Sequence, residues 1–178
     1  MRGRISRNSA AARTSSRAIL DVVHALRCGA FLETSSLRSS QVSLPYVIGI
    51  VLSAGVALFA RTVGLDRDRA FYPTVMIVIA SYYVLFAAMT GSVQTVLAES
   101  VVMSVFVAAA VAGFKSSAWI VVAALAGHGV FDAFHGRVLE NPGVPAWWPA
   151  WCLAYDVGAA AGLAWLLRRG LVANYGKA

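Results

Sequence analysis

Ionisable side chains stand inside stretches of sequence that are otherwise apolar, and they are the residues best suited to do chemistry. They are Glu99, His128, Asp132, His135 and Asp156. Each such residue costs roughly 2.5–3.5 kcal/mol when a helix carries it to the centre of a lipid bilayer. Residues this unfavourable need a reason to be there, so they mark the candidate functional site.

Three of these residues recur at helical spacing within one apolar stretch. His128, Asp132 and His135 stand at positions i, i+4 and i+7. At about 100° per residue, this spacing places them on one narrow stripe of a helix. His128 and His135 would be about 10.5 Å apart along the axis. One ion could therefore bind either neighbouring pair more easily than all three residues.

The residue types indicate metal chemistry. Two imidazoles and three carboxylates form a suitable ligand set for Zn, Mn or Fe ions. We expect a divalent metal, such as Zn, held by His128, Asp132 and His135, with Glu99 or Asp156 as a further ligand or general base. A metal ion can turn water into a nucleophile near neutral pH. The pattern predicts a metal-dependent, membrane-embedded enzyme that acts on a lipid or other apolar substrate.

The same residues fit two other functions. His and acidic side chains also build proton and ion pathways, which would make the chain a small transporter or proton-coupled carrier. Polar pairs can also simply tie helices together, which would make it an accessory membrane protein with a structural polar core. Cys152 shares the face of Asp156 and is interpreted as a small core residue. Tyr82 and Tyr83 could contribute to the wall of the site.

Long apolar segments must position these residues. Of the 178 residues, 59% are hydrophobic and 13% are charged, whereas a soluble domain carries about 25% charged residues. A bilayer core needs about 20 mostly apolar residues per helix, and strands would show alternation that is missing here. The sequence predicts an all-α integral membrane bundle of five transmembrane helices, at roughly 45–63, 71–90, 93–113, 117–136 and 147–167.

Short links make successive helices antiparallel, so the depths of the polar residues can be compared. We call side A the side on which the 45–63 helix begins, and side B the opposite side. Glu99, Asp132 and Asp156 would lie about 9, 6 and 14 Å from side A. We therefore expect spans three, four and five to bring their polar residues together in one pocket that opens towards side A.

The segments outside the spans are polar. Residues 1–43 form a basic, serine-rich arm that carries seven arginines, opposed only by Asp21 and Glu33. Beside a membrane domain at 44–170, this arm predicts an interfacial helix on anionic lipid headgroups, or a disordered segment, and not a nucleic-acid partner. Residues 171–178 form a short tail. The charged link from Asp66 to Arg69 is expected to be a solvated turn at headgroup level.

Basic residues leave the orientation open. Side B would carry Arg61, Arg67, Arg69, Lys115, Arg168, Arg169 and Lys177, and side A would carry Arg137 together with the arm. Without the arm, the positive-inside rule puts side B in the cytoplasm. The arginines of the arm argue for the opposite orientation.

Three stretches carry a resemblance to a known family. They are GLDRDRAFYPTVMIVIASYYVLFA (64–87), ALAGHGVFDAFHG (124–136) and NPGVPAWWPAWCLAYDV (141–157). Together they resemble a family of small bacterial multi-pass membrane proteins with HxxxDxxH in a membrane span. The resemblance covers most of residues 45–167 and excludes the arm. It implies a helical membrane architecture and a bacterial inner membrane, and it implies no activity.

A weaker likeness is to the ceramidase and progestin-receptor-like membrane hydrolases. Members of that group hold zinc with membrane-embedded His, with Asp and Ser nearby. They typically have about seven spans and spread their histidines over several helices, whereas His128 and His135 share one predicted helix here. The likeness is an analogy that supports the metal hypothesis without assigning an activity.

Overall fold

Helices make up nearly all of the chain that the structure describes. The computed structural model describes residues 43–172, and the predicted N-terminal arm and most of the predicted tail lie outside this range. The helices are Ser43–Val63, α2 (Phe71–Met89), α3 (Val93–Lys115), α4 (Ala118–Val138) and α5 (Trp148–Arg168), with a short 3-10 helix η1 at Leu65–Arg67. No strand occurs between residues 43 and 172, so the predicted all-α class is confirmed.

All five long helices are long and apolar enough to cross a membrane. The mean hydropathy of their most apolar windows runs from 1.3 for α4 to 2.1 for α3. Their ends lie within two residues of the predicted ends. The predicted integral membrane bundle of five spans is therefore confirmed.

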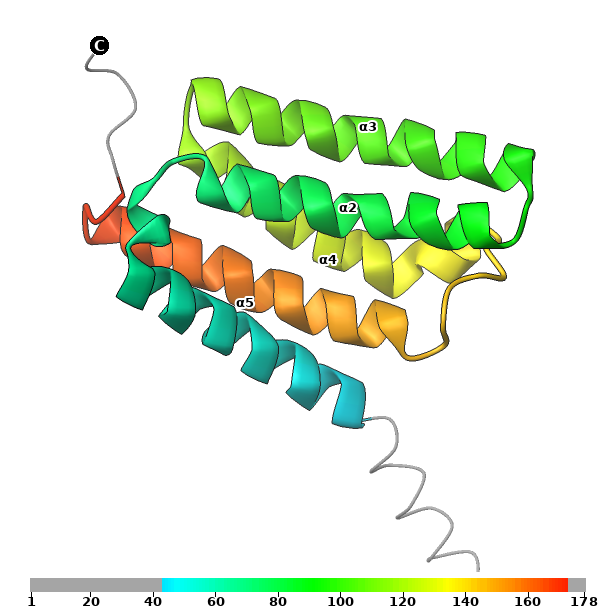
Figure 1. The fold of residues 1–178 in the computed structure, drawn as a ribbon, viewed down its shortest axis with the longest axis horizontal. Coiled ribbons are helices and arrows are strands. Elements are labelled where there is room, and N and C mark those ends of the chain that lie inside the picture. The colour runs from blue at the N-terminus through cyan, green and yellow to red at the C-terminus, as the bar shows by residue number, and fades with distance from the viewer. Residues whose placement is uncertain (1–42, 173–178) are drawn as a thin grey trace, which may run out of the picture. The chain divides into compact units, whose positions relative to one another are not determined.

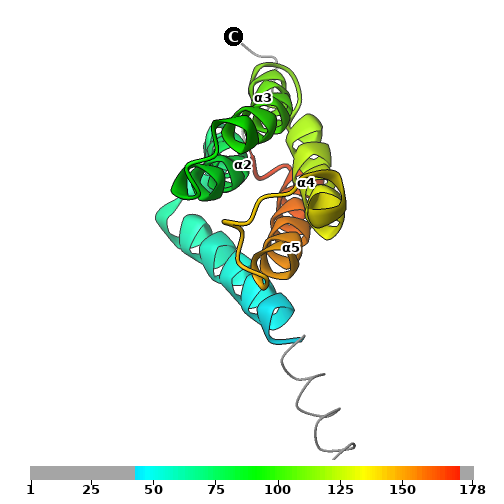
Figure 2. The ribbon, with the colours of Figure 1, turned by 90° about the vertical axis from the view of Figure 1, so that its right-hand side faces the viewer.

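The helices run alternately up and down, as the short links require. Figure 1 shows the links 90–92 and 139–147 at one end of the bundle, which is side A, and the links 64–70 and 116–117 at the other end. Figure 2 looks along the bundle from side A, where α2, α3, α4 and α5 follow one another around its axis. The polar residues of α3, α4 and α5 can therefore face one another across this axis.

Local chemistry sets the helix ends at side A. Gly91 adopts a φ of 74°, which lets the chain reverse between α2 and α3 in a very short link. Ser92 then caps α3, since its hydroxyl accepts a hydrogen bond from the backbone N–H of Thr95 at 3.3 Å. Pro149 stands in the first turn of α5, where its missing N–H leaves no helical bond unmade. These signals fix where α3 and α5 begin, and therefore how far Glu99 and Asp156 lie from side A.

The link at side B differs from the prediction. Asp66 is buried at 1% exposed and pairs with Arg61 at 3.1 Å, so this part of the link is not a solvated turn. The prediction was wrong for Asp66 because η1 turns this side chain inwards, while Asp68 stays exposed. A buried carboxylate in this position needs the guanidinium of Arg61 as its partner.

Small residues let the first helix approach α5. A Cβ atom at Gly49 would collide with the carbonyl oxygen of Trp151, and a Cβ atom at Gly158 would stand 2.6 Å from the hydroxyl oxygen of Ser53. Such glycines allow close packing of helix backbones inside a membrane. By contrast, a Cβ atom at Gly55 of the same helix would meet nothing within 4 Å.

This difference gives a matched pair of substitutions. Gly49→Ala is expected to lower the free energy of unfolding by about 1–3 kcal/mol, because the added methyl group forces the two helices apart. Gly55→Ala should leave it unchanged or slightly raised. Unfolding by SDS titration in bicelles measures both. Equal effects of the two substitutions would contradict this packing.

Candidate functional site

Four buried side chains with metal-binding atoms meet between α4 and α5. They are His128 and Asp132 of α4, and Cys152 and Asp156 of α5. One potential ligand atom of each lies within 4.8 Å of those of the other three, and each residue is at most 2% exposed. We call this set the His128 cluster.

The distances within the His128 cluster are short. The Nδ1 atom of His128 lies 2.7 Å from Oδ2 of Asp156 and 3.5 Å from Oδ2 of Asp132. The sulfur of Cys152 lies 4.0 Å from Oδ2 of Asp156. Oδ2 of Asp132 and Oδ1 of Asp156 are buried and have no hydrogen-bond partner in the described part of the chain. The cluster thus contains more acceptor atoms than its donors satisfy.

Helical spacing and a glycine build this cluster. His128 and Asp132 are four residues apart on α4, and Cys152 and Asp156 are four apart on α5, so each pair lies on one helix face. Gly129 lies where these faces meet, and a Cβ atom there would stand 3.2 Å from the side chain of Leu153 and 3.4 Å from Cβ of Asp156. The contact between α4 and α5 is therefore close at a residue that lies next to His128 in the sequence.

A second buried cluster lies nearer to side A. The Nε2 atom of His135 lies 2.8 Å from Oε1 of Glu99, which joins α4 to α3. The same Oε1 accepts a hydrogen bond at 2.9 Å from the side-chain amide of Asn141, in the link after α4. This amide also donates to the backbone carbonyl of Tyr83 at 3.0 Å. We call Glu99, His135 and Asn141 the Glu99 cluster.

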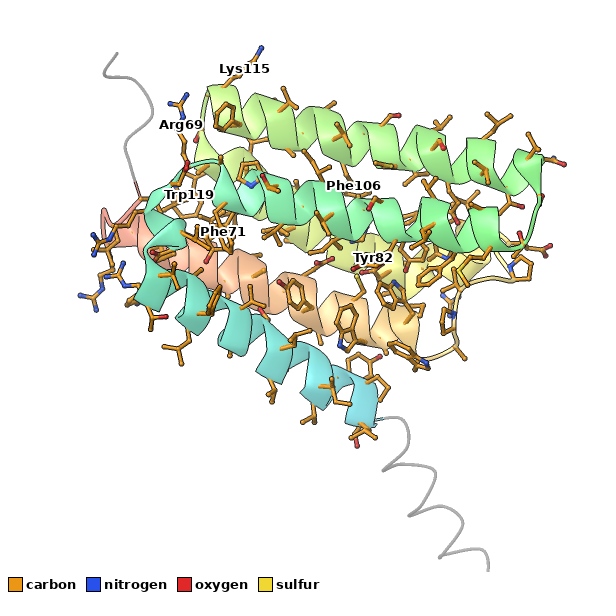
Figure 3. All side chains as sticks on the ribbon, in the orientation of Figure 1. Arg69, Phe71, Tyr82, Phe106, Lys115 and Trp119 are labelled. Atoms are coloured by element: carbon orange, nitrogen blue, oxygen red, sulfur yellow. The ribbon has the colours of Figure 1, made fainter. Side chains whose placement is uncertain are left out.

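Tyr83 of α2 connects the two clusters. Its hydroxyl donates to Oδ1 of Asp132 at 2.6 Å, and its ring stacks on the ring of His135 with 4.0 Å between the centroids. Phe106 packs edge-on against His128 at 4.7 Å, and Phe131 packs edge-on against His135 at 5.3 Å. Figure 3 shows the labelled Phe106 on the bundle. Aromatic rings thus replace water around both histidines, which strengthens electrostatic interactions there.

Spans three, four and five do bring polar residues together, but the prediction of a single shared pocket was wrong, because these residues form two separate buried clusters. The His128 cluster unites α4 with α5, and the Glu99 cluster unites α4 with α3. His128 and Asp132 lie together as predicted, whereas His135 turns to Glu99. His128 and His135 are about two helical turns apart along α4, so they reach different neighbouring helices.

Sequence reasoning did not find the roles of three residues in or between these clusters. Cys152 was interpreted as a core residue, and it does lie in the core, but its sulfur also lies within the His128 cluster. Asn141 looked like a loop residue, and nothing in its sequence neighbourhood signals that it folds back onto Glu99. Tyr82 and Tyr83 were both expected only as possible wall residues. Tyr83 instead connects the two clusters, whereas Tyr82 packs on Trp148 with 4.9 Å between the ring centroids. For Cys152, the sequence did offer a signal, which is its i, i+4 spacing from Asp156.

The comparisons with known proteins give no match. No family model, no curated protein and no solved structure is similar to this chain. What the site does must therefore be inferred from its own geometry.

The hydroxyl of Tyr83 gives a direct test of the link between the clusters. Tyr83→Phe removes the donor to Asp132 and leaves a buried carboxylate oxygen without its partner. The free energy of unfolding should fall by about 1–3 kcal/mol. Tyr82→Phe is the matched control, since Tyr82 is the adjacent tyrosine of α2 and contacts Phe86 and Trp148 through its ring. Bicelle unfolding that gives the same value for both variants would remove Tyr83 from the network.

Proposed function

We propose that this chain is a metal-dependent enzyme embedded in a bacterial inner membrane, acting on a lipid or other apolar substrate. The observation that carries the proposal is the His128 cluster, in which imidazole, thiol and two carboxyl groups converge without exposure to solvent. Basic residues of the N-terminal arm would contact anionic lipid headgroups on the membrane surface.

The donor set fits a borderline metal such as zinc. Tetrahedral zinc takes nitrogen, oxygen and sulfur ligands at about 2.0–2.3 Å, so shifts of about an ångström would bring these four side chains into place. The two unpartnered oxygens of Asp132 and Asp156 support this, because a bound cation satisfies both. Magnesium prefers hard oxygen ligands, so the soft thiol of Cys152 would not suit a magnesium site.

The hydroxyl of Tyr83 would hold one of the ligands in position. The Tyr83 hydroxyl occupies Oδ1 of Asp132 and leaves Oδ2 turned to the cluster. Such a partner fixes a ligand's orientation and tunes its basicity. Bound zinc supplies Lewis acidity towards a carbonyl or phosphoryl oxygen and lowers the proton affinity of water.

The His135–Glu99 pair would relay protons, because the imidazole Nε2 atom and the carboxylate Oε1 atom lie 2.8 Å apart, within hydrogen-bond reach. Asp156 would act as a ligand in this scheme, and Glu99 as the distal base.

An apolar groove offers a place for a hydrocarbon chain. It has a volume of about 290 Å³ and lies between the helix Ser43–Val63, α2 and α5. Its wall includes Val56, Ile79, Trp151 and Tyr155. Since Tyr155 precedes Asp156 on α5, a chain in this groove would run beside the helix that carries two of the ligands. The groove therefore supports the proposal that the substrate is apolar.

Metal content tests the proposal directly. The wild-type chain, purified in detergent after exposure to Zn²⁺ and removal of the excess, should retain stoichiometric zinc. His128→Ala should lose the metal, because it removes a ligand at the centre of the cluster. His135→Ala is the control on the same helix and should keep it. Elemental analysis of folded, monodisperse protein gives the answer, and a wild-type chain free of metal would overturn the proposal.

The carrier hypothesis has one observation in its favour. Polar contacts run from Glu99 through His135 to the Tyr83 ring, and from the Tyr83 hydroxyl through Asp132 and His128 to Asp156. A row of such groups is typical of proton pathways. Towards side B, however, the core continues with apolar residues such as Leu125 and Leu163. The row therefore spans only part of the bundle.

Proton flux separates the two functions. As an enzyme, the chain in liposomes should show no more proton uptake than empty liposomes when a pH gradient is applied. A pH-sensitive dye inside the vesicles measures this. Flux that is present in the wild-type chain and lost in Asp132→Asn would favour the carrier. If the wild-type chain shows neither metal binding nor proton flux, and the variants only lose their fold, the accessory protein with a structural polar core is favoured.

A further inference from the structure

A polar pocket at side A is distinct from the His128 cluster. It has a volume of about 310 Å³ and lies between the first turns of α3 and the link that follows α4. Its lining residues are Gln94, Thr95, Ala98, Glu99, Leu139 and Glu140. None of the four residues of the His128 cluster contributes to this wall. The pocket therefore needs an explanation of its own.

Glu99 is the buried part of the wall. The residue is 1% exposed, and its Oε1 atom is held by both His135 and Asn141. Its Oε2 atom is also buried and has no hydrogen-bond partner among the residues described. A buried carboxylate oxygen without a partner is unfavourable, and a ligand that donates a hydrogen bond would satisfy it.

The net charge of the pocket favours a cation. Glu140 is exposed at the rim and adds a second carboxylate. His135 is the ionisable partner of Glu99, and even as a cation it balances only one of the two acids. The nearest arginine in sequence, Arg137, lies over the ring of Phe134 and is not part of the wall. A negative pocket in a chain of net charge +7 attracts a small cation locally.

Size and wall chemistry narrow the cation to one class. A bare metal ion does not need about 310 Å³, whereas organic ligands occupy pockets of this order. Quaternary ammonium groups are recognised by aromatic faces, and no aromatic residue lines this pocket. Carboxylates and an amide oxygen instead accept hydrogen bonds, which a primary ammonium group donates.

We propose that this pocket binds a primary alkylammonium cation, with Oε2 of Glu99 as the deep acceptor and the carboxylate of Glu140 as the acceptor at the rim. Asn141 and His135 hold Oε1, so Glu99 is oriented before the cation arrives. This site does not require a metal in the His128 cluster. The ammonium group belongs either to an ethanolamine lipid headgroup or to a free amine.

The test compares ethanolamine with choline on the full chain in a zwitterionic detergent. Calorimetric titration should show ethanolamine binding at least about tenfold more tightly than choline. Glu99→Gln and Glu140→Gln should each weaken ethanolamine binding by about tenfold or more, because each removes one charged acceptor. Asp68→Asn, an exposed acid at side B, is the control and should bind like the wild type.

Three results would overturn the proposal: no ethanolamine binding by the wild type, equal binding of both amines, or unchanged binding by Glu140→Gln. Glu140 is exposed, so its variant should fold even if Glu99→Gln does not. Bicelles that contain phosphatidylethanolamine distinguish the two sources. If they compete with ethanolamine, the ligand is a lipid headgroup. If they do not compete while ethanolamine still binds, the ligand is a soluble amine, and the site stands in either case.

Discussion

A carboxylate inside a lipid bilayer has no water to bind, and this constraint shapes the whole bundle. Glu99, Asp132 and Asp156 are all at most 2% exposed. Each has a partner on another helix or in a link, because its own helix uses its backbone donors internally. The His128–Asp156 and His135–Glu99 pairs thus determine how α4 turns towards its neighbours. The apolar surfaces alone would allow many rotations, since lipid and protein side chains are equally apolar.

Tyr83 gives the two histidine pairs a common support. The hydroxyl, the ring and the backbone carbonyl of this one residue contact Asp132, His135 and Asn141 respectively. The two clusters therefore share one side chain that contacts both of them. The proposed metal centre and the proposed ammonium pocket would lie at the two ends of this connection.

The sequence predicted the parts that depend on composition and helical period. Hydropathy located all five spans, and the 3.6-residue period placed His128, Asp132 and His135 on one buried face. It could not predict the partner of His135, since that depends on how α3 and α4 are rotated about their axes. It also missed Asn141, because a link residue gains its partner only from the path of the folded chain. Asp66 was misplaced for the same reason: the inward turn of η1 has no hydrophobic pattern of its own.

The pairing of α4 with α5 has a consequence for biogenesis. These two helices have the lowest mean hydropathies of the five, 1.3 and 1.4, and each carries half of the His128–Asp156 contact. Alone, either helix exposes an unmatched polar group to lipid during translation, whereas a helical hairpin shields both groups at once. We expect the translocon to release them together as one unit. A glycosylation-mapping assay in which α4 integrates as well alone as with α5 attached would argue against this order.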